Sequence, residues 1–122
     1  MRIMSLAVGG AMLMLSVPAF AGTKHIVHQE KKSFFIEAPG DPKARDDGWK
    51  KIKKLEIKAG DSIVFKNTDT ISHNVFSKKL VEFEIAKQAP GEEDVVTYDA
   101  SGKTQVRCAI HPRMKLKIKV VD

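Results

Sequence analysis

The sequence predicts a small all-β domain, an antiparallel sandwich or barrel. This prediction rests on three observations. Charged and apolar residues alternate in short segments, turn residues separate these segments at short intervals, and helical periodicity is weak. The alternation is clearest at 54–58 and 115–120, where lysine or glutamate occupies every second position. A period of two is typical of a strand with one buried face.

The other expected elements follow from the same signals. Turns are expected at 59–61, 90–91 and 101–102, because glycine, proline and aspartate favour turn conformations. Residues 38–50, rich in proline, glycine and aspartate, are expected to form a long solvated loop that ends at Trp49. A polar loop is expected at 67–70, and 81–86 is compatible with either a strand or a helical turn. Further strands are expected at 25–28, 33–37, 62–66, 73–77, 95–98 and 104–109.

The first residues have the order of a secretory signal peptide. Arg2 supplies a positive charge, residues 3–17 are almost all apolar or small, and Pro18-Ala19-Phe20-Ala21 provides a small-x-small cleavage signal. The apolar run is shorter than the roughly 20 residues of a membrane-spanning helix. We therefore expect residues 1–21 to be removed and residues 22–122 to form one periplasmic or secreted domain with no membrane span.

Charge and cysteine content narrow the expected partners and chemistry. The chain has 21 basic and 15 acidic residues. An exported protein rarely meets nucleic acid, so we expect an acidic protein partner or another anionic surface instead. Cys108 is the single cysteine and cannot form an internal disulfide. A lone thiol in an oxidising compartment is expected to be buried or bound to something.

The segment Cys108-Ala109-Ile110-His111-Pro112-Arg113-Met114 places a thiol, an imidazole and a thioether three residues apart. Soft sulfur ligands with imidazole suit copper, and a His₂Cys set with a weak axial methionine is the blue-copper arrangement. A second histidine must come from elsewhere. We expect it to be His73, which begins a strand after a loop. His25 and His28 are expected to lie in the tail of the mature chain.

These residues carry a resemblance to a known family. Ser72-His73-Asn74-Val75-Phe76, followed by the Cys-x-x-His-x-x-Met segment, resembles the cupredoxins, and the short ligand loop looks like that of amicyanin. Residues 59–67 resemble the plastocyanin strand that precedes the first histidine, and 89–92 resemble the turn between the ligands. The resemblance implies a Greek-key antiparallel β-sandwich that holds one type 1 copper ion with His73, Cys108, His111 and Met114.

The resemblance also implies a role. A cupredoxin passes single electrons between a donor and an acceptor redox protein, which it meets transiently and as a monomer, with His111 as the electron port. It further implies that the Asn74 backbone donates a hydrogen bond to the Cys108 sulfur and that the Asn74 side chain braces the ligand loop. Basic residues near the port either steer an acidic partner or form an ordinary solvated face; these are Lys78, Lys79, Arg113 and Lys115.

Two other classes of function use some of the same residues. A copper carrier or chaperone would use the same soft ligands but would release the ion readily. An enzyme could use Cys108 as a nucleophile activated by His111, but Met114 has no role in that chemistry. Multicopper oxidase chemistry needs further copper sites and more domains than residues 22–122 can provide. The sequence therefore predicts an electron carrier and not an enzyme.

Overall fold

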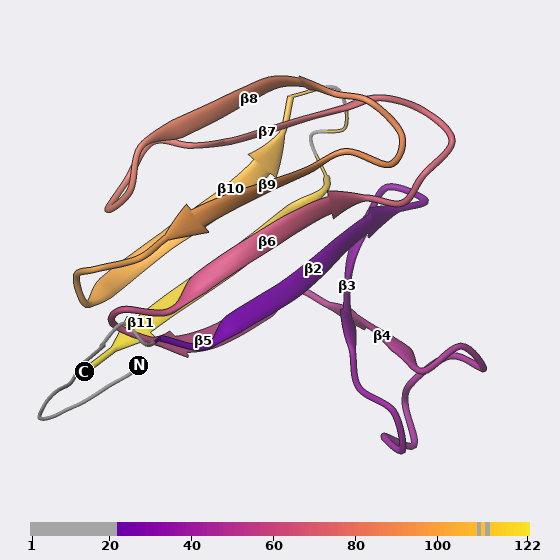
Figure 1. Ribbon diagram of the computed structural model, residues 1–122, viewed down its shortest axis with the longest axis horizontal. Helices are drawn as coiled ribbons and strands as arrows, with labels where there is room; N and C mark the ends of the chain where they lie inside the picture. The colour runs from indigo at the N-terminus through magenta and orange to yellow at the C-terminus, as the bar shows by residue number, and fades with distance from the viewer. Residues whose placement is uncertain (1–21, 110, 112) are drawn as a thin grey trace, which may run out of the picture.

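Ten strands in two five-stranded sheets make up the part of the chain that this computed structural model describes, which is residues 22–109, 111 and 113–122 (Figure 1). The predicted signal peptide, 1–21, lies outside the described residues. One sheet has the order β5-β11-β10-β7-β8 and the other β4-β3-β2-β6-β9. The strands are β2 (Lys24–Glu30), β3 (Ser33–Glu37), β4 (Trp49–Ile52), β5 (Lys54–Lys58), β6 (Ser62–Asn67), β7 (His73–Ser77), β8 (Phe83–Gln88), β9 (Glu93–Thr97), β10 (Gly102–Cys108) and β11 (Lys115–Val121).

The predicted all-β fold is confirmed. Most strand pairings are antiparallel, but β2 pairs with β6 and β11 pairs with β5 in parallel. Both parallel pairings join strands far apart along the chain, as the connections of a sandwich require. The segment 81–86, which was ambiguous in sequence, contributes to strand β8. Within the described residues, no helix has the length and apolarity needed to cross a membrane.

The core lies between the two sheets and follows the alternation of the sequence. In β11 the lysines are exposed while Leu116, Ile118 and Val120 are buried, and in β10 Val106 and Cys108 are buried. The facing sheet contributes further apolar side chains to the same cluster, which are Val27, Phe34, Ile63 and Phe65. The buried face of β10 therefore carries Cys108 into the interior at the end of that strand.

The N-terminal segment confirms the strand expected at 25–28 and corrects the expectation that its histidines lie in a tail. His25 and His28 lie in β2, which pairs with β6 over Lys24–Gln29. His28 is buried, stacks on Trp49 with ring centroids 3.6 Å apart, and its Nε2 lies 3.0 Å from Glu37 Oε2. The expected loop also ends earlier, because β4 already begins at Trp49. β3 pairs with β2 and β4 pairs with β3, and in Figure 1 the loop between β3 and β4 projects away from the other strands.

Asp61 ties the start of β2 to the turn between β5 and β6. Its Oδ1 accepts a hydrogen bond from Thr23 N at 2.9 Å, and its Oδ2 accepts one from Lys58 N at 3.0 Å. Oδ2 also lies 2.9 Å from His25 Nε2. The hydrogen bond to His25, followed by that from Lys58, lowers the pKa of Asp61 from 3.8 to about 2. The ionised carboxylate therefore stabilises the folded chain.

This contribution predicts an acid dependence of stability. Because the pKa of Asp61 is lower in the folded chain than in the unfolded one, its stabilisation is complete above about pH 5 and is lost as the pH falls towards about 2. We expect Asp61→Asn to be less stable than the wild type at pH 7, with the difference shrinking on acidification. Urea unfolding at several pH values measures this. Asp46→Asn, in the exposed loop, is the control, and a pH-independent difference for Asp61→Asn would contradict the assignment.

Candidate metal centre

Two adjacent strands bring the predicted ligands together. His73 is the first residue of β7 and Cys108 is the last of β10, and these antiparallel strands pair Cys108 with Val75. His73 is fully buried and Cys108 is 1% exposed. His111 follows three residues after Cys108 and is partly exposed. The sheet therefore places one histidine beside the cysteine, and the loop after β10 supplies the other.

Three potential ligand atoms form a compact triangle. Cys108 Sγ lies 3.7 Å from His73 Nδ1 and 3.8 Å from His111 Nδ1. The ligand atoms of the three residues all lie within 4.8 Å of one another. A thiolate and an imidazole about 2.3 Å and 2.0 Å from a shared ion, separated by a trigonal angle, are themselves about 3.7 Å apart. The spacing therefore fits an ion held between the three residues.

Met114 closes the ligand loop. Its amide N donates to His111 O at 2.8 Å, and its carbonyl accepts from Cys108 N at 3.2 Å. Its side chain is 1% exposed and belongs to the same buried cluster as Cys108. The loop thus returns to the end of β10 and holds all three of its expected ligand residues at one end of the sandwich. Ile110 and Pro112 lie outside the described residues, and the role of Met114 as axial ligand stays a prediction.

The other ring nitrogen of His73 is held by a carboxylate. His73 Nε2 lies 3.0 Å from Asp69 Oδ2, so a proton on Nε2 is shared with Asp69 and Nδ1 is left free to face Cys108. Histidines that bind metals commonly donate their second ring N–H in this way, which fixes the tautomer and orients the ring. Sequence reasoning placed Asp69 in an ordinary polar loop and missed this role.

Asp69 is itself fixed by the backbone around it. Its Oδ2 also accepts from Lys31 N at 3.1 Å, and its Oδ1 accepts from Thr70 N at 2.8 Å. Burial is the strongest influence on the pKa of Asp69 and raises it, but the hydrogen bonds from His73, Thr70 and Lys31 together outweigh burial and lower the pKa. The carboxylate is therefore kept ionised, as an acceptor for the His73 ring.

A buried amide network supports the loop that carries Asp69. Asn67 is fully buried; its Nδ2 donates to Gln88 O at 2.7 Å and to Ile71 O at 2.9 Å, and its Oδ1 accepts from Asp69 N at 3.0 Å. Gln88 in turn accepts from Gln29, donates to Phe65 O at 2.8 Å, and is fully buried. Satisfied buried polar groups restrict a loop to one conformation, so this network presets the position of His73.

The Asn74 side chain makes a contact that the sequence did not predict. Its Nδ2 donates to Ala86 O in β8 at 2.9 Å, so the side chain braces the neighbouring strand. Its register position explains this, because β7 lies between β10 and β8 and a bulge between His73 and Val75 lets Asn74 reach β8. The expected brace on the ligand loop, which includes residues outside the described ones, stays a prediction. The expected hydrogen bond from the Asn74 backbone to the Cys108 sulfur also stays a prediction.

Removing the Asp69 carboxylate should weaken metal binding. We expect Asp69→Ala to lower copper affinity about 10- to 100-fold, the usual effect of losing a residue that orients a metal-bound histidine. Asp69→Asn is the matched control, because its amide oxygen can still accept from His73 and should restore most of the affinity. Competition with a chelator of known affinity measures both. Equal affinity for wild type and Asp69→Ala would show that Asp69 does not orient His73.

Comparison with solved structures identifies the fold of the sandwich. Amicyanin from Paracoccus versutus is similar over 85% of this chain and 84% of its own, with 24% identity and a TM-score of 0.57. The purple cupredoxin from Nitrosopumilus maritimus matches 80% of this chain and 98% of its own, with 18% identity and a TM-score of 0.53. These similarities show that the fold is cupredoxin-like.

A third solved structure belongs to a larger protein. The copper-containing nitrite reductase from Thermus scotoductus matches 57% of this chain, with 28% identity and a TM-score of 0.52. The match spans only 19% of the nitrite reductase chain. No curated protein sequence matches this chain.

The family assignment comes from the sequence itself. The model of copper binding proteins of the plastocyanin/azurin family matches residues 50–121. This region contains β5–β11, and with them His73, Cys108, His111 and Met114. Soft sulfur and imidazole donors in the observed triangle fit copper. The chain therefore belongs to the plastocyanin/azurin family of copper-binding proteins.

Proposed function

We propose that this protein is an exported type 1 copper protein that carries single electrons between redox partners. The observation that supports this most strongly is the triangle of Cys108 Sγ with His73 Nδ1 and His111 Nδ1, at 3.7 Å and 3.8 Å. Met114 is proposed as the weak fourth ligand. Copper bound by this set would supply one-electron chemistry between Cu(I) and Cu(II).

The chain keeps the ligand geometry nearly constant while an electron moves. His73 is fixed through Asp69, and Cys108 is fixed at the end of β10 by its pairing with β7. The ligand loop is closed by the hydrogen bonds between Cys108, Met114 and His111. Because the ligands are held in place by the fold, little rearrangement is needed on oxidation or reduction. A small rearrangement favours fast electron transfer.

The partly exposed ring of His111 is proposed as the point where electrons enter and leave. His73 and Cys108 are buried, so His111 is the most accessible of these three ligands. Ile71, an apolar side chain that is 48% exposed, lies two residues before His73 in the loop at this end of β7. An exposed apolar side chain near a partly exposed ligand suits a small, transient interface.

The remaining features of the proposal follow from the sequence. Residues 1–21 are proposed to direct export to the periplasm or outside the cell, and residues 22–122 to act as a monomer. The domain is proposed to have no catalytic reaction of its own, because no second copper cluster or substrate site is expected from its residues. Donor and acceptor are proposed to be redox proteins, met transiently, with an acidic surface toward this basic chain.

Repeated redox cycling in the presence of a Cu(I) chelator tests the proposal. The copper-loaded mature domain is reduced with ascorbate and reoxidised with ferricyanide, with bathocuproine disulfonate present throughout. An electron carrier should recover its visible absorption after each cycle, since the ion stays bound in both oxidation states. A copper carrier would lose the ion to the chelator in the first reduction, and that result would replace the proposed function. The Cys108→Ser variant is the metal-site control.

A further inference from the structure

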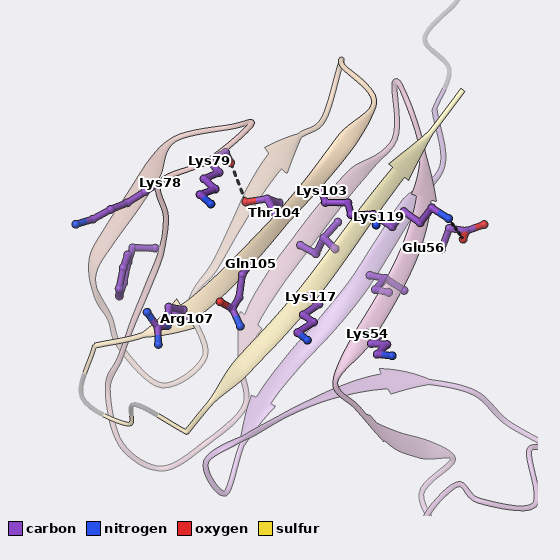
Figure 2. Close-up of a pocket in the computed structure, with 13 residues that line it drawn as sticks. Lys54, Glu56, Lys78, Lys79, Lys103, Thr104, Gln105, Arg107, Lys117 and Lys119 are labelled. Carbon is purple, nitrogen blue, oxygen red and sulfur yellow. Dashed lines mark hydrogen bonds and ion pairs between the residues drawn. The ribbon is translucent and has the colours of Figure 1, made fainter.

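The outer face of one sheet carries a concentrated positive charge. Strands β5, β11, β10 and β7 and the turn after β7 surround a hollow of about 930 Å³ (Figure 2). The side chains labelled in Figure 2 come from β5, β10, β11 and the turn after β7, and most of them are basic. We call this surface the basic groove. Its cationic residues are Lys54, Lys78, Lys79, Lys103, Arg107, Lys117 and Lys119, and its acidic residue is Glu56.

The charges of the basic groove face one another across the strands. Lys103 lies opposite Lys119 in the β10–β11 pairing, and Lys117 lies opposite Lys54 in the β11–β5 pairing. Like charges placed directly opposite in a sheet destabilise it. A face with acidic residues opposite the basic ones would be equally soluble and would not have this repulsion. Lys119 also lies opposite Glu56, but Lys103 and Lys117 each face a second lysine, an arrangement that a ligand of opposite charge would relieve.

Little within the described residues neutralises the groove. Lys119 Nζ lies 4.0 Å from Glu56 Oε1, and both side chains are more than half exposed, so the pair is weak. No other groove cation has an ion pair with a described residue. Elsewhere the chain does pair its charges, as in Lys50 with Asp41 and Arg45 with Glu30. The groove is thus an uncompensated positive surface.

The basic groove reaches the copper end of the sandwich. Arg107 immediately precedes Cys108 in β10, and it pairs with Phe76, which also lines the groove. Arg107 is exposed while Cys108 is buried, because successive residues of a strand point to opposite faces. A molecule bound on the outer face at the C-terminal end of β10 is therefore separated from Cys108 only by the backbone of that strand.

We propose that the basic groove docks an acidic surface of a protein redox partner. This inference rests on the proposed function, since it assigns a docking face to the electron carrier. The positive charge of the groove favours an anionic ligand, and its concave shape favours a protein over a membrane. The groove is concave and has apolar side chains, Leu55 and Phe76, among its lining, so a convex protein surface can fill it. A flat bilayer would contact only the rim.

Docking of this kind mainly affects the rate at which the two proteins associate. A surface of one sign raises the association rate of an oppositely charged partner, and salt suppresses the effect. The sequence left two roles open for four basic residues near the port, steering of a partner or an ordinary solvated face, and the groove separates the four. Lys78 and Lys79 line the groove, whereas Lys115 and Arg113 do not. Most of the groove charge comes from residues of β5, β10 and β11 that the sequence did not connect with partner binding, namely Lys54, Lys103, Arg107, Lys117 and Lys119.

The test compares two variants that lose the same charge. The groove variant is Lys103→Gln/Lys117→Gln/Lys119→Gln, and the control is Lys24→Gln/Lys43→Gln/Lys51→Gln, whose lysines are also exposed and lie outside the groove. The probe is an oligo-glutamate peptide, added to the mature protein at low ionic strength and followed by amide chemical shifts. We expect shifts on β5, β10 and β11, and about tenfold weaker binding for the groove variant alone, from three exposed ion pairs of about 0.5 kcal/mol each.

Several outcomes would overturn the inference. Equal affinities of the two variants, or shifts centred away from the groove, would show that the peptide senses only net charge. Tighter groove-dependent binding to phosphatidylcholine vesicles containing phosphatidylserine than to the peptide would replace the protein partner by a membrane. The visible spectrum of the Cu(II)-loaded protein, recorded beside the binding measurement, separates the two proposals. Groove-dependent binding by a protein that shows no type 1 spectrum with Cu(II) would refute the electron carrier. A type 1 spectrum without groove-dependent binding would refute the docking face alone.

Discussion

Replacing Cys108 by serine is expected to abolish the intense visible absorption of the Cu(II)-loaded protein. That absorption requires charge transfer from a thiolate to copper, and Cys108 is the single cysteine of the chain. Its Sγ is shared between His73 and His111 at 3.7 Å and 3.8 Å, and a serine hydroxyl stays protonated and is a poor ligand for copper. Copper affinity should fall by more than the 10- to 100-fold that is typical of losing a residue that only orients a ligand. Absorption titration with Cu(II) measures both effects.

Met114→Leu provides the matched control for this substitution. It removes the proposed weak axial ligand with a side chain of similar size and leaves the three residues of the triangle in place. We expect this variant to keep the visible band and to shift the reduction potential. If Cys108→Ser keeps the band, the thiolate is not a ligand. If Met114→Leu loses copper as completely as Cys108→Ser, Met114 is more than a weak axial ligand.

Phe65→Ala is expected to have the largest effect on stability. Phe65 is fully buried in β6, and its ring lies 5.8 Å from that of Phe83 in the facing sheet. Truncating a buried phenylalanine typically costs about 3–5 kcal/mol, because both apolar burial and packing contacts are lost. Domains have a free energy of unfolding of about 5–15 kcal/mol, so this change removes a large part of it. Urea unfolding of the metal-free domain, followed through Trp49 fluorescence, gives the difference.

Val95→Ala is the control for the core substitution. Val95 lies on β9, which pairs with β6, but its side chain is 53% exposed. We expect its effect to stay within about 0.5 kcal/mol, as for surface substitutions in general. Comparable losses for Phe65→Ala and Val95→Ala would mean that the two sheets do not share the core described here.

The ligand set could be predicted from sequence because most of it is local. Cys108, His111 and Met114 lie three residues apart, and their combination of thiol, imidazole and thioether is specific for a soft metal. The period-two alternation of β5 and β11 likewise specifies which residues face the core. His73 was the harder prediction, because only the pairing of β7 with β10 brings it to Cys108.

The supporting residues could not be predicted because their roles depend on the tertiary structure. Asp69 orients His73, but one of the backbone hydrogen bonds that hold Asp69 comes from Lys31, which is distant in sequence. Lys31 and Lys32 form the turn between β2 and β3 with φ angles of 52° and 62°. Such angles are usual for glycine or asparagine, so two lysines gave no turn signal. The turn and its contact with Asp69 were therefore invisible in the sequence.

The parallel pairings and the basic groove were missed for a related reason. Alternation predicts strands and their buried faces, but it contains no information on which strands are neighbours. The lysines of β11 looked like one solvated face. Only the parallel pairing of β11 with β5 and its antiparallel pairing with β10 place Lys54, Lys117 and Lys103 on one continuous surface. The number of charges can thus be read from the sequence, but their arrangement on one surface depends on which strands are neighbours.

The visible and electron paramagnetic resonance spectra of the mature domain with one equivalent of Cu(II) test the central claim most directly. A type 1 site predicts an intense thiolate-to-copper band that reaches its maximum at one copper per chain and bleaches with ascorbate. It also predicts the narrow copper hyperfine splitting of a thiolate-bound ion. A colourless protein that binds copper with an ordinary Cu(II) spectrum would contradict the claim, because copper would then be bound without Cys108.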